Sequence, residues 1–177
     1  EEMSRGILIT IPYISHLFAK LRKEYCLSPD SLVTHFHRWG FCKSRNLSLL
    51  RKGFEHYFQK DYVSALHLLV FQFEDILRNL LREANRPVTK PPDSGRMGGA
   101  TMLGSLLLDE EFRQEAGASL MRYYELILAD PNGLNLRNNL AHGLMEVEEM
   151  SRSIVELIIH VLLSLTRFRI ERKNADR

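Results

Sequence analysis

Apolar residues recur at helical spacing over most of this chain, and most clearly between residues 62 and 81. There they fall three and four residues apart, at Tyr62, Ala65, Leu66, Leu69, Val70, Phe73, Ile76, Leu77, Leu80 and Leu81. This spacing places one wide apolar stripe on a helix of 3.6 residues per turn. No stretch alternates with a period of two, and no hairpin turn separates two β-rich runs. The sequence therefore predicts an all-α protein.

The same spacing, together with capping residues, predicts four further helices. They cover residues 3–24, where Pro12 should kink or divide the helix, residues 29–40 behind Ser28, residues 47–59, and residues 147–170. Residues 109–128 form one more candidate. We expect a single bundle of about five to seven helices. Helices 62–81 and 147–170 should be its central pair, because they carry the widest apolar faces.

Length and composition fit one globular domain with an appendage. Of the 177 residues, 45% are hydrophobic and 26% are charged, and the net charge is +2. This balance argues against a purely electrostatic nucleic-acid binder but leaves room for a local basic patch. We divide the chain into a helical extension packed on the bundle (1–46), the bundle itself (47–170) and a frayed charged tail (171–177). A loop rich in proline and glycine interrupts the bundle at residues 85–99.

Cysteine content and hydropathy indicate the compartment. Cys26 and Cys42 are too few for a secreted disulfide framework, so we expect free thiols in a reducing environment. The apolar stretches 7–18 and 154–165 are interrupted and shorter than the about 20 residues that a membrane span needs. We expect no membrane contact from this segment itself. The predicted location is cytoplasmic or cytosol-facing, with any membrane attachment outside this fragment.

The residues that could carry chemistry gather between residues 130 and 143. A Pro-Asn-Gly turn precedes a short predicted helix that starts at Leu136 behind Asn135, and Gly143 should stop it. Arg137 and Asn138 fall in its first turn, where unpaired backbone N–H groups favour an anion. The arginine adds a planar, always charged fork that suits phosphate.

His142 adds a group that exchanges protons near neutral pH. Asn138 lies four residues earlier on the same predicted face, so it could orient the imidazole or contact a ligand. Arg137 would have to bend round the helix to reach the same pocket. The alternative is an asparagine-rich helix cap followed by a histidine without a catalytic role.

The stretch Asn135-Leu-Arg-Asn-Asn-Leu-Ala-His-Gly143 resembles the signature of the HEPN superfamily. That signature is an arginine, usually followed by a polar residue, with a histidine four to six residues beyond it. More specifically, the chain is similar to a HEPN-like family of bacteria and eukaryotes that includes the endoplasmic-reticulum-membrane-associated RNA degradation protein. Residues 65–78 are similar to that family's other recognisable stretch. The resemblance covers roughly residues 50–165.

The resemblance implies an all-helical, usually dimeric bundle and, in many members, metal-independent RNA cleavage, whereas other members are inactive scaffolds or partners of nucleotidyltransferases. It makes Arg137, Asn138 and His142 the expected catalytic residues. Glu74 and Arg78 are either an ordinary helix-face pair or, like Asn139, groups that position the catalytic residues. Three basic residues of the loop at residues 85–99 are candidate contacts to the RNA backbone, namely Arg86, Lys90 and Arg96.

Two functions remain open. The first is an endoribonuclease that cleaves RNA by 2′-hydroxyl transesterification at a site shared by two chains. The second is a non-catalytic dimerisation, interaction or nucleotide-binding module, which the near-neutral charge favours. We expect neither a metal nor a cofactor. His35, His37 and Cys42 come nearest to a ligand set, but no second pair with metal-site spacing follows them.

Overall fold

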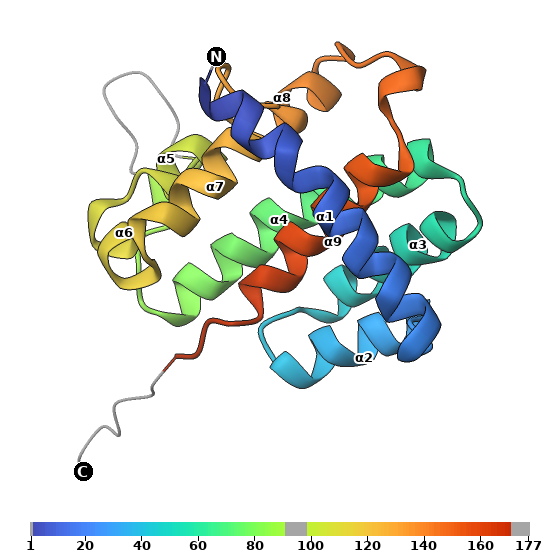
Figure 1. Ribbon diagram of the computed structural model, residues 1–177. Coiled ribbons are helices and arrows are strands. Elements are labelled where there is room, and N and C mark those ends of the chain that lie inside the picture. Colours follow the sequence, from blue (N-terminus) through green and yellow to red (C-terminus); the bar gives the residue numbers. More distant parts are fainter. Residues whose placement is uncertain (1, 91–98, 171–177) are drawn as a thin grey trace.

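The computed structural model describes residues 2–90 and 99–170, which form nine α-helices and one 3₁₀ helix (Figure 1). Six α-helices have eleven residues or more, namely α1 (Glu2–Glu24), α2 (Pro29–Trp39), α3 (Ser44–Phe58), α4 (Tyr62–Glu83), α7 (Ala118–Leu128) and α9 (Arg152–Leu165). The shorter ones are α5 (Leu103–Leu107), α6 (Glu110–Ala116) and α8 (Leu136–Ala141). The prediction of an all-α bundle is confirmed.

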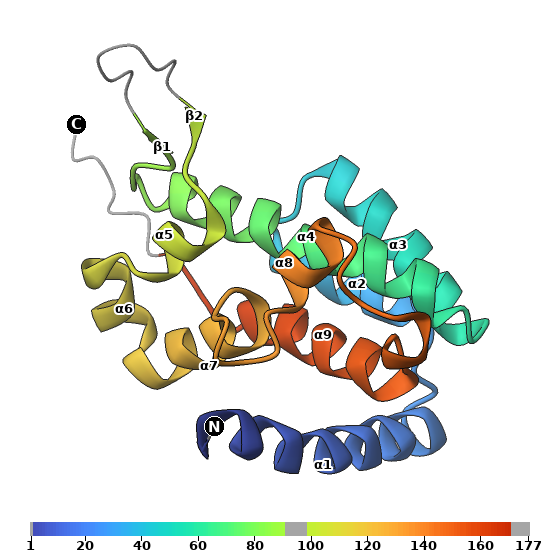
Figure 2. The ribbon, with the colours of Figure 1, turned by 90° about the horizontal axis from the view of Figure 1, so that it is seen from above.

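Helix α4 runs through the bundle and packs against both α3 and α9 (Figures 1 and 2). Its stripe side chains, such as Leu66 and Phe73, are fully buried, as is Ile158 of α9. The predicted central pair is therefore present. Helix α1 lies along α9 on the outer side of the bundle, and α2 packs on α3. Phe18 of α1 and Phe36 of α2 are buried in the same apolar cluster as the other helices.

Several helix ends differ from the predicted ones for local reasons. Pro12 lies inside α1 and does not divide it. The helix expected over 109–128 is split into α6 and α7 at Gly117, whose φ of 93° a side chain would disfavour. The helix expected over 147–170 begins as the 3₁₀ helix η1 (Val147–Glu149) and ends at Leu165. The helical pattern thus locates the elements better than their ends.

A short antiparallel pair of strands, which the sequence does not predict, lies at the two ends of the loop expected over residues 85–99. Strand β1 (Thr89–Lys90) pairs with β2 (Gly99–Ala100), with Thr89 opposite Ala100. Two residues on each side are too few to show a period-two pattern. Residues 91–98 and the tail at 171–177, which we expected to be frayed, lie outside the described residues. None of the described helices has the length and hydropathy needed to cross a bilayer.

Candidate functional site

The turn before α8 is fixed tightly against α7. Asp130 Oδ1 accepts a hydrogen bond from Asn132 N–H at 2.8 Å. Leu134 N–H donates to the carbonyl oxygen of Leu126 at 2.7 Å. The backbone approaches so closely that a Cβ on Gly133 would lie 1.9 Å from the same oxygen. Only glycine fits at this position, and the contact sets where α8 begins.

We expect Gly133→Ala to destabilise the domain by about 2–3 kcal/mol, because the turn must move away from a backbone atom. The displaced turn would carry α8 with it. Urea denaturation followed by circular dichroism measures the loss. Gly104→Ala is the matched control, since nothing lies within 4 Å of a Cβ at that helical position. Equal stability of both variants would show that the turn does not anchor α8.

Helix α8 starts at Leu136, as predicted, and the buried side chains of Leu136 and Leu140 hold it on the bundle. Asn135 precedes it in a left-handed conformation with a φ of 49°, and its side chain does not cap the helix. The helix ends at Ala141, and Gly143 continues the chain with a φ of 65°. The helix therefore ends close to Gly143, as predicted. His142 is the first residue beyond the helix.

Arg137 is bound to Glu74 of α4. Its Nε and Nη2 both lie 3.1 Å from Glu74 Oε2, and its Nη1 donates to Asn138 Oδ1 at 3.2 Å. Arg78, one turn along α4, donates from Nη2 to Glu74 Oε1 at 2.6 Å and to the carbonyl of Thr101 at 2.9 Å. Glu74 therefore connects the two arginines and ties α8 to α4.

This cluster of Glu74, Arg78 and Arg137 keeps a positive charge. The exposed fractions of the three side chains are 13%, 15% and 29%, so water screens the ion pairs only partly. One carboxylate faces two guanidinium groups. Arg137 has five N–H donors, and the contacts above use three of them. Two donors on a half-buried cation remain for a ligand.

The asparagines of the motif are used within the turn. Asn138 Nδ2 donates to Asn135 Oδ1 at 2.8 Å and to the carbonyl of Ala129 at 3.4 Å. Asn139 Nδ2 donates to the carbonyl of Leu134 at 3.1 Å. Asn138 therefore does not orient His142 by its side chain, although its carbonyl accepts from His142 N–H at 3.0 Å. The side-chain amide of Asn138 is engaged by Asn135, Ala129 and Arg137 instead.

The His142 side chain is exposed, and no described residue makes a hydrogen bond with it. Other histidines have structural contacts. His35 Nε2 lies 2.8 Å from Thr166 Oγ1, and His160 Nδ1 lies 2.9 Å from the Tyr123 hydroxyl. Burial lowers the pKa of His160 below its ordinary value. His142 is thus placed to meet a ligand, whereas these two stabilise helix packing.

The side chain of Arg86, the first of the three loop cations, lies among carboxylates. Arg86 makes ion pairs with Asp109, Glu111 and Glu115 at 3.3, 3.2 and 2.6 Å, so carboxylates already surround its guanidinium. These partners lie at the start of α6 and along it. A contact between Arg86 and an RNA backbone would have to compete with these carboxylates, and it stays a prediction. Lys90 lies in β1, and Arg96 lies outside the described residues.

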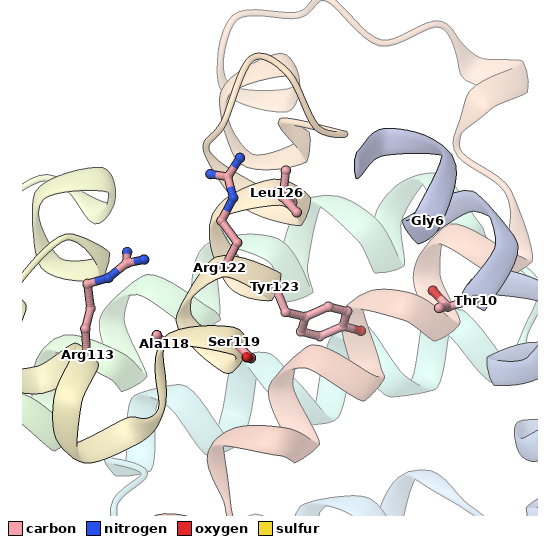
Figure 3. A pocket seen from close by; sticks show the side chains of 8 residues that line it. All are labelled: Gly6, Thr10, Arg113, Ala118, Ser119, Arg122, Tyr123 and Leu126. Carbon is pink, nitrogen blue, oxygen red and sulfur yellow. The ribbon is translucent and has the colours of Figure 1, made fainter. Parts of the chain in front are cut away.

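Neither the groove between α1 and α7 nor any metal-ligand cluster among the described residues points to a competing catalytic site. A groove of about 630 Å³ runs between α1 and α7 (Figure 3), but its arginines Arg113 and Arg122 both pair with Glu125. Over residues 2–90 and 99–170, no three His, Cys, Asp or Glu side chains could hold a metal ion. Burial raises the pKa of the Cys42 thiol to about 12, which makes it a poor ligand or nucleophile.

No protein-family model matches the chain, and neither a curated protein nor a solved structure matches it. The motif around α8 therefore carries the functional argument alone. The sequence did not reveal two exposed apolar side chains beside it, Leu144 and Val147, with exposed fractions of 68% and 64%. In the sequence, they are indicated only by the fact that apolar residues continue after Gly143, where the helix was expected to end.

Proposed function

We propose that this chain is a metal-independent endoribonuclease of the HEPN type that acts as a homodimer. The observation that supports it most is the arrangement at the two ends of α8. Arg137 is held by Glu74 with donors to spare, and His142 lies exposed just past the other end. One helix thus presents a cation suited to phosphate and a group able to move protons.

The steps of RNA cleavage are assigned to His142 of each chain and to Arg137. A base takes the proton of the RNA 2′-hydroxyl, the 2′-oxygen attacks phosphorus, and an acid protonates the departing 5′-oxygen. His142 of one chain serves as base and that of the partner as acid, because each chain contributes one such histidine. Arg137 stabilises charge on the phosphate. The products carry a 2′,3′-cyclic phosphate and a 5′-hydroxyl.

The dimer contact is proposed at the apolar side chains that follow the motif. Leu144 and Val147 lie two and five residues after His142 and are largely exposed. A two-fold contact that covers them would bring both copies of His142 together, because an isologous interface apposes identical surfaces. It would also exclude water, which strengthens the pull of Arg137 on a phosphate.

Leu144→Glu is expected to weaken dimerisation by about tenfold or more and to lower RNA cleavage in parallel, because a charge would enter an apolar contact. Light scattering across a concentration series and a cleavage assay measure the two effects. Tyr25→Glu is the control, since Tyr25 is equally exposed but lies at the end of α1. A fully active, fully dimeric Leu144→Glu protein would place the interface elsewhere.

Arg137→Lys is expected to reduce cleavage by about 10–100-fold, because an ammonium cannot hold Glu74 and a phosphate with a planar fork. Cleavage rates of the variant and the parent at saturating RNA measure this reduction. Arg45→Lys is the matched control, because Arg45 also forms an ion pair with a carboxylate of α4. Its Nη2 lies 2.8 Å from Asp75 Oδ1. Its activity should match the parent. Wild-type rates in both variants would remove Arg137 from the mechanism.

The alternative is a dimerisation, interaction or nucleotide-binding module without catalysis. The Glu74 contact favours it, since a carboxylate already occupies one edge of Arg137. A chain that dimerises and leaves every RNA intact would support this alternative. In either case we propose a reducing, cytosol-facing location, because Cys26 and Cys42 are free thiols.

A further inference from the structure

A second charged cluster lies where α1 ends, α3 turns into α4 and α9 begins, at one end of the bundle (Figure 2). Glu156 of α9 is fully buried there. Its Oε1 accepts hydrogen bonds from Tyr57 O–H at 2.6 Å, Arg22 Nη1 at 3.0 Å and Arg152 Nε at 2.8 Å. The Tyr57 hydroxyl also accepts from Arg22. The network belongs to no part of the proposed RNA site.

The cluster holds more positive charge than its own carboxylate can neutralise. Arg22 and Arg152 share Glu156, and Lys60 stands on the α3–α4 turn with no ion pair to a described residue. The nearest carboxylate in the sequence, Asp61, is engaged elsewhere. Its Oδ1 accepts from Ser64 N–H at 3.1 Å, and its Oδ2 lies 2.9 Å from His56 Nδ1.

These cations surround a cavity of about 120 Å³, which is lined by Arg22, Tyr57, Phe58, Lys60, Tyr62 and Arg152. Two of the lining residues begin helices, Tyr62 at the N-terminus of α4 and Arg152 at that of α9. The positive ends of two helix dipoles therefore lie at the same cavity. Ser151, the residue before α9, makes no capping hydrogen bond with its side chain. Both dipoles add to the attraction for an anion.

One donor in this cluster lacks an acceptor. Arg22 Nη2 is buried, and no described residue accepts a hydrogen bond from it. A buried N–H without a partner is costly, and an anion in the cavity would relieve that cost. Glu156 Oε2 is also buried without a partner and repels an anion. The three cations that line the cavity outnumber this one carboxylate, and two of them, Arg22 and Arg152, already bind its other oxygen.

We propose that this cavity binds a single phosphate group, either as inorganic phosphate or as a terminal phosphate monoester. Arg22 and Arg152 supply guanidinium donors, which suit phosphate oxygens, and Lys60 supplies a mobile ammonium. The small volume admits one oxyanion, so the remainder of a larger ligand would extend into solvent.

Isothermal titration of the full chain at constant ionic strength tests this inference. Inorganic phosphate and a nucleoside 5′-monophosphate are separate arms that distinguish the two sources, and the unphosphorylated nucleoside is the blank. We expect saturable binding of at least one phosphate ligand with a Kd of about 1 mM or below. Absence of saturable binding in both arms overturns the proposal.

Lys60→Gln and Arg152→Gln are each expected to weaken phosphate binding by about tenfold, the usual effect of losing a charged donor. Lys52→Gln and Arg51→Gln are matched controls on α3, where both side chains pair with acidic residues outside the cavity lining. Their affinity should equal that of the parent. Unchanged affinity in both cavity variants overturns the site. Circular dichroism of each variant verifies the fold, and RNA cleavage should remain, which separates this test from that of the proposed function.

Discussion

Replacement of His142 by alanine should lower the rate of RNA cleavage by at least about 10²–10⁴-fold, the usual contribution of a general acid or base. The loss should be at the upper end, because both proton transfers use a copy of this residue. Stability should not change, since the side chain is exposed and no described residue bonds to it. Single-turnover cleavage in chelator and the thermal midpoint measure the two effects.

His67→Ala is the control for that experiment. His67 is also an exposed histidine, and its ring Nδ1 lies 2.9 Å from the carbonyl of Val63 within α4. Its replacement should leave the cleavage rate at the parent value. If the His142→Ala protein cleaves as fast as the parent, the activity belongs to other residues or to a contaminant.

The largest effect on stability is expected at Glu156. Glu156→Leu should cost about 3–5 kcal/mol, because it removes the carboxylate that Arg22 and Arg152 share. It also removes the acceptor of the Tyr57 hydroxyl, which burial and the adjacent carboxylate keep protonated by raising its pKa far above the ordinary value. Urea denaturation of the variant and the parent measures the free energy of unfolding.

A double variant separates lost charge pairing from lost packing. Arg22→Met combined with Glu156→Leu should recover much of the stability, since a buried ion pair replaced by apolar groups is often neutral. Asp75→Leu is the control, because it breaks a more exposed pair, that with Arg45. A loss below about 1 kcal/mol for Glu156→Leu would show that the network is not structural.

The helices could be predicted because their signals are local. The stripe of α4 and the cap of α2, where Ser28 accepts from Ser31 N–H at 3.1 Å, are visible within a few residues. The break at Gly117 was missed, because helix-forming residues lie on both sides of it. A glycine within such a run shows its positive φ only after tertiary packing has placed α6 and α7.

The site could be predicted only in part. The start of α8 agrees with the structure. Glu74 was open to two interpretations, and the structure shows both the helix-face pair with Arg78 and a contact with Arg137. The acidic partners of Arg86 lie more than twenty residues away in sequence, so spacing could not reveal them. The same holds for two of the three partners of Glu156, because Arg22 and Tyr57 come from α1 and α3, whereas Arg152 lies only four residues earlier on α9. Long-range ion pairs leave no local pattern.

Subunit mixing tests most directly whether RNA is cleaved at a site that two chains share. Parent and His142→Ala chains are combined in varying ratios, subunits are allowed to exchange, and cleavage is measured at constant total protein. A shared site requires both histidines, so an equal mixture should retain about one quarter of the parent rate, because only parent homodimers are active. A linear decline, with about one half of the rate retained, would contradict the shared site and show that each chain cleaves RNA independently.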